Sequence, residues 1–387
     1  MQGKRVLMVV TLGLAGWLVI PLLARVQQSG AEAGYSLAEG DGKALVATSC
    51  VGCHSMGTSL RRGRSREEWV QTVNDMVSRG APIVPADAET MIGYLSEHYG
   101  LDFVPPLDQF VMVWVDRQGN VEPLAAPPGA YNRPMLSPDG TQVAMDIPSD
   151  TSDIWIYDIP SDELRRLTFE GNNRSATWSN DGQWVAFGSD RHQSLEGGRS
   201  YREDHEAYRK RADGSGEAER LTDAEFNHGP QRWTPDGKTL AISEIHPETG
   251  RDLWMLPFEG DRTPWLFVAT PALEGGVSFS ADGNWLAHTS GETGQREVVV
   301  RAFPEAEPAH QVSTGGGIEV VWPLNSKELF YRNGNKRMAV EITTGDTLTV
   351  GTPRALFEGD FVNSPGSRAY WDATQDGQRF LMLKKVE

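Results

Sequence analysis

The stretch Ser137-Pro138-Asp139-Gly140 decides the fold, because its pattern returns along the second part of the chain. A hydroxyl residue followed two positions later by Asp-Gly occurs again at Ser179-Asn180-Asp181-Gly182, Thr234-Pro235-Asp236-Gly237 and Ser280-Ala281-Asp282-Gly283. Gln375-Asp376-Gly377 keeps the core of the pattern, and Leu324-Asn325-Ser326-Lys327 occupies the remaining expected place in degenerate form. The intervals of about 42 to 55 residues indicate one structural unit per repeat.

Each repeat joins a turn to a strand. The four-residue repeat has Ser or Thr at its first position, Pro at its second in two of the copies, and Gly at its fourth. This pattern is typical of a tight turn whose last residue takes a positive φ angle. An apolar strand follows every turn, at 143–145, 184–187, 240–242, 285–287, 329–331 and 380–382. Further strands recur downstream at 154–157, 253–255 and 298–300, and then at 164–168 and 219–222. Repeats of this length and strand content predict the four-stranded blades of a β-propeller.

The last repeat reaches Glu387 with strands missing from its blade. Val111–Val115 and Val121–Leu124 precede the first turn and have the character of strands. We expect them to complete the last blade, because a ring closed by both ends of the chain has no free sheet edges. The sequence therefore predicts six blades over residues 108–387.

The repeats resemble those of TolB-type propellers across essentially all of residues 108–387. Asp153–Tyr157 and Thr374–Met382 also look like propellers attached to bacterial membrane-bound kinases. The resemblance implies a surface that binds partners more often than it catalyses, although a fold does not determine a function. Kinase signatures and the Gly-x-Ser-x-Gly elbow of serine hydrolases do not occur in the sequence. The histidines lack the spacing of metal ligands. Asp204-His205-Glu206 could bind a metal at a loop, but we favour its interpretation as a solvated loop.

Cys50-Val51-Gly52-Cys53-His54 is the second motif, and it holds both of the 2 cysteines. A Cys-x-x-Cys-His run is the attachment signature of c-type haem, in which the thiols bond the porphyrin and the histidine ligates the iron. A redox dithiol, half of a zinc site and a structural disulfide are the alternatives. The adjacent His54 and the lack of a second cysteine pair argue against the first two. We predict one covalent haem c at Cys50 and Cys53, with His54 as an axial ligand.

Three helices are expected around this motif, over residues 36–49, 65–79 and 86–99, with Ser36 and Ser65 as N-cap residues. The pattern resembles a small class I cytochrome c domain over residues 35–103. The resemblance, to short cytochromes fused to bacterial dehydrogenases and oxidases, implies that Met76 is the sixth iron ligand. The alternatives are that Met76 is a core residue, or that Met91 or His98 takes its place. Leu101–Leu107, with two prolines, reads as a linker.

The N-terminus has the pattern of an export signal. Lys4 and Arg5 precede an uncharged apolar run from Val6 to Ala24. The run nearly suffices to span a bilayer, although Pro21 interrupts it, and Ala31-x-Ala33 offers a cleavage site. The N-terminal segment could be cleaved there or retained as an anchor. We favour a retained signal and anchor segment over residues 1–30, in which residues 6–24 tether a periplasmic protein to the inner membrane. The formal net charge of −17 argues against nucleic acid as a partner.

These features predict a multidomain chain, in which a small all-α cytochrome c domain is followed by an all-β six-bladed propeller. The predicted function is that of an exported cytochrome that carries single electrons and has no catalytic turnover of its own. Its propeller would dock redox partner proteins of the cell envelope. A haem-based sensor with the propeller as its output surface is the alternative. A third hypothesis, an enzyme that oxidises a small molecule in the propeller funnel, needs a substrate site that the sequence does not reveal.

Overall fold

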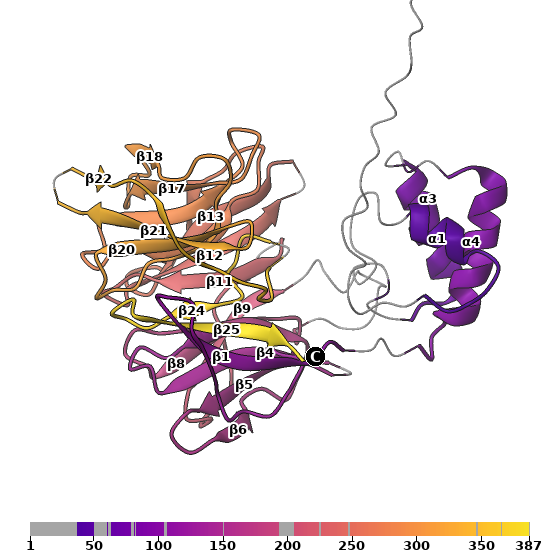
Figure 1. The fold of residues 1–387 in the computed structure, drawn as a ribbon, viewed down its shortest axis with the longest axis horizontal. Helices are drawn as coiled ribbons and strands as arrows, with labels where there is room; N and C mark the ends of the chain where they lie inside the picture. Colours follow the sequence, from indigo (N-terminus) through magenta and orange to yellow (C-terminus); the bar gives the residue numbers. More distant parts are fainter. Residues whose placement is uncertain are drawn as a thin grey trace, which may run out of the picture. The chain divides into compact units, whose positions relative to one another are not determined.

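The computed structural model describes residues 37–386, apart from 50–59, 61–62, 79–80, 82, 104–106, 150, 193–204, 224–225, 247, 346 and 365. The chain divides into two compact units, Met1–Pro106 and Leu107–Glu387. Within the described residues, the first unit contains the helices and the second contains the strands (Figure 1).

The first unit contains three short helices, α1 (Lys43–Ser49), α3 (Arg66–Ser78) and α4 (Pro85–His98). Trp69 of α3 and Met91 of α4 are buried in one apolar core, and the Trp69 indole N–H donates to the carbonyl of Tyr99 at 2.9 Å. Ser65 caps α3 as expected, because its Oγ accepts from the N–H of Glu68 at 3.2 Å. The first helix was expected to begin near Ser36, but α1 begins at Lys43 because Gly42 has a φ of +107°.

These helices alone do not identify a cytochrome fold, so the predicted all-α cytochrome c domain over residues 35–103 is not confirmed. None of the helices in the described ranges is long and apolar enough to cross a membrane. The predicted anchor, residues 6–24, lies outside those ranges.

The second unit is a six-bladed β-propeller, as predicted, and each blade is an antiparallel sheet (Figure 1). Blade 1 consists of β3 (Asn132–Leu136), β4 (Gln142–Pro148), β5 (Ser152–Asp158) and β6 (Glu163–Arg166). Blade 2 consists of β7 (Asn173–Trp178), β8 (Trp184–Ser189), β9 (Glu206–Arg211) and β10 (Glu219–Arg220). Blade 3 consists of β11 (His228–Trp233), β12 (Thr239–His246), β13 (Gly250–Pro257) and β14 (Trp265–Val268).

The remaining blades follow in chain order. Blade 4 consists of β15 (Gly275–Phe279), β16 (Trp285–Ser290), β17 (Glu297–Ala302) and β18 (Ala309–Gln311). Blade 5 consists of β19 (Ile318–Val321), β20 (Glu328–Asn333), β21 (Lys336–Thr343) and β22 (Thr349–Val350), with β23 (Arg354–Glu358) also paired to β21. Blade 6 consists of β24 (Asp372–Ala373), β25 (Arg379–Lys385), β1 (Phe110–Asp116) and β2 (Val121–Pro123).

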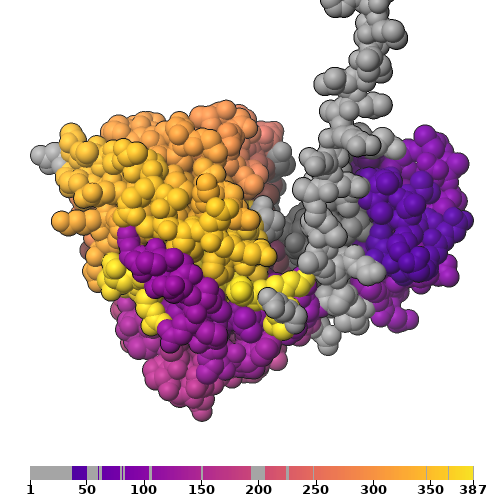
Figure 2. Space-filling model, viewed as in Figure 1, coloured from indigo at the N-terminus to yellow at the C-terminus, as the bar shows by residue number. Residues whose placement is uncertain are grey.

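Blade 6 therefore joins the two ends of the propeller, as the sequence predicts. β1 pairs with β25 in an unbroken antiparallel register from Phe110–Lys385 to Asp116–Arg379. Figure 2 shows these two ends side by side on one face. Since β1 lies between β2 and β25, both of its edges are paired.

The repeated turns close the hairpin between the first two strands of each blade. In the first turn, the Gly140 N–H donates to the Ser137 carbonyl at 2.8 Å, and the Ser137 hydroxyl donates to Asp139 at 2.6 Å. The hydrogen bond from Ser137 lowers the pKa of Asp139. The last glycine of each complete turn has a φ between +66° and +75°, as expected. The degenerate turn begins one residue earlier than its sequence suggests, because the Ser326 N–H donates to the Pro323 carbonyl at 3.1 Å.

The first strands of the blades surround the propeller axis. β3, β7, β11, β15 and β19 contact one another in that order, and β24 contacts β3. Each of these five strands has a bulge, and Arg133, Ser175 and Glu319 take positive φ angles there, of +49°, +63° and +58°. A bulge redirects side chains and backbone groups locally, and these bulges shape the wall of the central channel.

Candidate functional site

The predicted haem ligands are not brought together by anything the structure describes. Cys50, Cys53 and His54 lie outside the described residues. Met76 lies on α3, where it is half-buried. The predicted attachment site and its sixth ligand therefore stay predictions.

His205 and Glu206 are not in a solvated loop, so that interpretation is wrong for both residues. Their exposed fractions are 3% and 2%, and Glu206 begins β9 and accepts a hydrogen bond from Thr222. The guanidinium of Arg174 lies 3.0 Å from Nδ1 of His205. Burial and the charge of Arg174 lower the pKa of His205 to about 3, so its ring is neutral at pH 7. Among the described residues, no three His, Cys, Asp or Glu side chains converge as a metal site.

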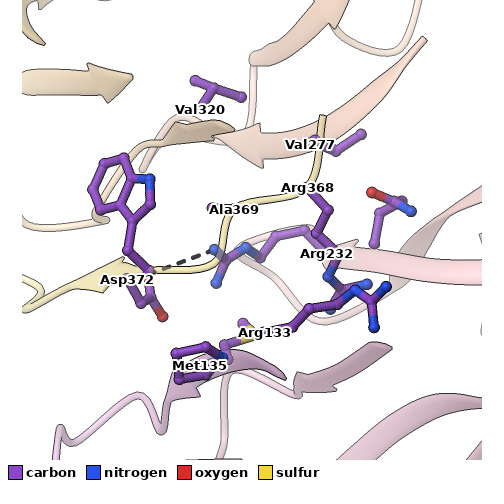
Figure 3. A pocket seen from close by; sticks show the side chains of 12 residues that line it. Arg133, Met135, Arg232, Val277, Val320, Arg368, Ala369 and Asp372 are labelled. Carbon is purple, nitrogen blue, oxygen red and sulfur yellow. Dashed lines mark ion pairs between the residues drawn. The ribbon is translucent and has the colours of Figure 1, made fainter. Parts of the chain in front are cut away.

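Three arginines from different elements meet in the central channel. Arg133 comes from β3, Arg232 from β11 and Arg368 from the segment before β24, and all three line one small cavity of about 30 Å³. Figure 3 shows their side chains around this space, which Val277 and Val320 also line. We call this set the channel arginines.

The surrounding blades hold the channel arginines in place. Nη1 of Arg133 lies 2.6 Å from Asp146, which also accepts from the Ser175 N–H of the neighbouring blade at 3.1 Å. The guanidinium of Arg368 donates to the backbone carbonyls of Ala176 and Pro230, in blades 2 and 3. Arg368 therefore crosses the channel and is fixed by neutral acceptors.

Asp372 is the acidic residue among the described side chains that line this cavity. It accepts from the N–H groups of Leu136 and Ala373, each at 3.0 Å, and lies 3.8 Å from Nη2 of Arg232 (Figure 3). Burial raises the pKa of Asp372 above its ordinary value, against the lowering effect of Arg232.

A second cavity of about 150 Å³ adjoins the first and shares Met135 and Arg232 with it. Its remaining lining comes from the repeated turns and the strand ends beside them, and includes Asn180, Asn325 and Gln375. We call this cavity the channel mouth. The larger cavity thus leads from the face that carries the turns to the channel arginines.

The channel arginines are not among the residues predicted from sequence motifs, although the sequence carries a signal for two of them. Arg133 lies four residues before Ser137, and Arg232 lies two residues before Thr234. Both residues therefore lie in the strand that precedes the turn. This is the first strand of its blade, which lies nearest the axis of a propeller. Arg368 has no such signal, because it precedes a strand of only two residues.

No family model matches the chain. An alignment over 119 positions, which covers 28% of the chain, is 34% identical to a protein of Bacillus subtilis called "Uncharacterized peptidase YuxL" and covers 16% of that protein. The structure of a putative TolB from Agrobacterium tumefaciens matches with a TM-score of 0.56 and 14% identity, over 73% of this chain and 99% of that one. TolB from Acinetobacter baumannii matches with a TM-score of 0.45 and 14% identity, over 78% and 69% of the two chains.

These comparisons contradict the predicted function as an electron-carrying cytochrome, and with it the alternative of a haem-based sensor. The solved structure that shares the fold is a putative TolB, the curated protein that matches a segment is named as a peptidase, and neither is a cytochrome. The prediction extended a five-residue motif to the function of the whole chain, whereas the likeness in fold covers 73% of it. In fold, residues 107–387 are a TolB-like six-bladed β-propeller.

Proposed function

We propose that the chain is an extracytoplasmic propeller that binds a partner protein of the cell envelope at the channel mouth. The observation that carries this proposal is the mouth itself, a cavity of about 150 Å³ that leads to fixed, charged side chains. Concave sites with a few well-placed polar groups are the usual binding sites of proteins. The TolB-like fold and the apolar leader over residues 6–24 support a place outside the cytoplasm, tethered to the inner membrane.

The channel favours binding over hydrolysis. Among the described residues that line the two cavities, none is a serine, cysteine or histidine. The lining instead supplies hydrogen-bond donors and positive charge, which recognise and orient a ligand. The match to the Bacillus subtilis peptidase spans only 16% of that protein, so its activity is not carried over to this chain.

Obstruction of the mouth tests this proposal. Asn325 is exposed on a turn at the mouth, and Asn325→Trp places a large ring there. The full chain, immobilised and exposed to detergent-solubilised envelope proteins, is expected to retain a partner, and the Asn325→Trp variant is expected to lose it. Leu266→Trp is the matched control, because Leu266 is 47% exposed on β14, away from the mouth. Equal retention by both variants would contradict the proposal, provided that both unfold at the wild-type temperature.

We also propose that Cys50 and Cys53 attach one haem c, with His54 and Met76 as iron ligands, without assigning electron transfer to the chain. The support is the sequence motif alone. Thioether bonds survive denaturation, so the denatured full chain is expected to retain haem in a peroxidase stain of a gel. The Cys50→Ser/Cys53→Ser double variant is expected to lose the stain. Equal staining of the two chains, or none in the wild type exported with a haem-attachment system, would reject the cofactor.

A further inference from the structure

The channel has a charge opposite to that of the chain as a whole. The chain carries a formal net charge of −17, but the described side chains lining the inner cavity comprise three arginines and one aspartate. Positive side chains concentrated in a narrow cleft of a negative protein attract an anion.

The partners of the channel arginines leave part of this charge uncompensated. Arg133 has Asp146 at 2.6 Å. Arg232 has Asp372 at 3.8 Å, which is too long for a hydrogen bond. Arg368 donates to two neutral carbonyls. Burial, with repulsion from Arg133, lowers the pKa of Arg368 to about 9, which still leaves it charged at pH 7.

We propose that Arg232 and Arg368, supported by Arg133, bind a carboxylate carried by an acidic peptide segment that enters through the channel mouth. This inference rests on the proposed function and specifies the chemistry of the partner. A guanidinium presents paired N–H donors that match the two oxygens of a carboxylate. The inner cavity of about 30 Å³ exceeds the roughly 10–15 Å³ that one water molecule needs, so a small polar group can enter it.

The walls of both cavities fit a peptide. Val277, Val320 and Trp371 line the inner cavity and exclude water, which strengthens an ionic hydrogen bond. The mouth of about 150 Å³ is lined by the side-chain amides of Asn180, Asn325 and Gln375. The Asn180 amide already donates to the Thr234 carbonyl and the Gln375 amide oxygen accepts from the Leu324 N–H, which leaves the exposed Asn325 amide to pair with a peptide backbone. A narrow opening of this kind admits an extended segment rather than a folded surface.

The test uses the full chain and three synthetic hexapeptides. Hexaglutamate with an amidated end carries only side-chain carboxylates, hexaglutamine with a free end carries only a terminal carboxylate, and amidated hexaglutamine carries neither. Calorimetric titration is expected to show binding of at least one carboxylate peptide and none of amidated hexaglutamine. Arg232→Met is expected to weaken that binding by about 10- to 100-fold, because hydrogen bonds to charged groups contribute about 1.5–3 kcal/mol.

Two further variants make the result specific. Arg379→Met removes the same charge from a side chain that is 44% exposed and paired with Glu122, and it is expected to leave peptide binding unchanged. Asp372→Asn removes the negative charge beside Arg232 and is expected to strengthen binding several-fold, a gain that misfolding cannot produce.

Three results would overturn the inference. One is that neither carboxylate peptide binds more tightly than amidated hexaglutamine. Another is equal weakening by Arg232→Met and Arg379→Met. The inference would also be overturned if inorganic phosphate displaced hexaglutamate and bound at least as tightly as the peptide. The channel would then be a simple anion site. If the partner is still lost by Asn325→Trp while no carboxylate peptide binds, the proposed function stands and this inference fails.

Discussion

Replacing Phe380 by alanine is expected to lower the free energy of unfolding of the propeller by about 3–5 kcal/mol. Phe380 lies on β25, is fully buried, and contacts aromatic rings of blades 5 and 6. Its ring centroid lies 5.1 Å from that of Phe330, 5.4 Å from Phe357 and 6.0 Å from Trp371. The substitution leaves a cavity beside the strand that closes the ring, so a loss of packing there also weakens the pairing of β1 with β25.

Urea denaturation followed by tryptophan fluorescence measures this loss. Phe169→Ala is the matched control, because the same side chain there is 65% exposed. Removal of an exposed side chain of this kind costs at most about 0.5–1 kcal/mol. If the two substitutions lowered the free energy of unfolding equally, the packing of Phe380 on β25 would not be a main source of the stability of the propeller.

Replacing Glu274 by alanine is expected to cost about 3–5 kcal/mol, because it removes one member of a buried, hydrogen-bonded polar cluster. Glu274 and His288 are both fully buried, and Nδ1 of His288 lies 3.0 Å from the carboxylate. Arg301 donates to Nε2 of His288 at 3.1 Å. The hydroxyls of Thr270 and Ser290 donate to Glu274 at 2.6 and 3.0 Å. Without the carboxylate, Nδ1 of His288 and the hydroxyl of Ser290 are left buried without this acceptor.

The pH dependence of stability separates this cluster from ordinary packing. Burial alone would raise the pKa of Glu274, but His288, Thr270 and Ser290 outweigh it and hold the pKa below the ordinary value of 4.5. A depressed carboxyl pKa stabilises the fold above the unfolded value and loses that effect as the pH falls through the folded value. The wild type is therefore expected to lose stability below pH 4.5 more steeply than Glu274→Ala.

Thermal unfolding between pH 7 and pH 3 measures this difference. Glu259→Ala is the control, since the Glu259 side chain is 69% exposed and pairs with Lys238 at the surface. It is expected to follow the wild type over the whole range. If the unfolding temperatures of Glu274→Ala and the wild type fell in parallel with pH, the charge of Glu274 would not contribute to the stability of the propeller.

The sequence was sufficient for the architecture because the information is local and repeated. A turn such as Ser137–Gly140 needs a hydroxyl, an aspartate and a glycine at fixed positions, and each is visible in the sequence. Closure by β1 and β25 was predictable because the strands missing at one end are present at the other. The sequence predicts that the first helix starts near Ser36, but α1 starts at Lys43 because the positive φ angle of Gly42 is not helical.

The candidate site could not be predicted in the same way, because it is assembled across the ring. Arg232 and Arg368 are far apart in sequence, and their meeting depends on the angle at which the bulged strands approach the axis. The burial of His205 was missed because a polar triplet reads as a loop unless its strand pairing is known. The functional error had another cause, since a short motif that is specific for a cofactor says little about what the larger unit binds.

A photo-crosslinking amino acid at the channel mouth tests the central claim most directly. The crosslinker is placed at position 325 of the full chain in living cells, with position 266 on β14 as the reference. We expect irradiation to give one discrete adduct with an envelope protein from position 325, abolished when Arg232 is replaced by methionine, and none from position 266. No adduct at position 325 together with a discrete adduct at position 266 would contradict the account, because the partner would then contact the outer strands of the propeller rather than its channel.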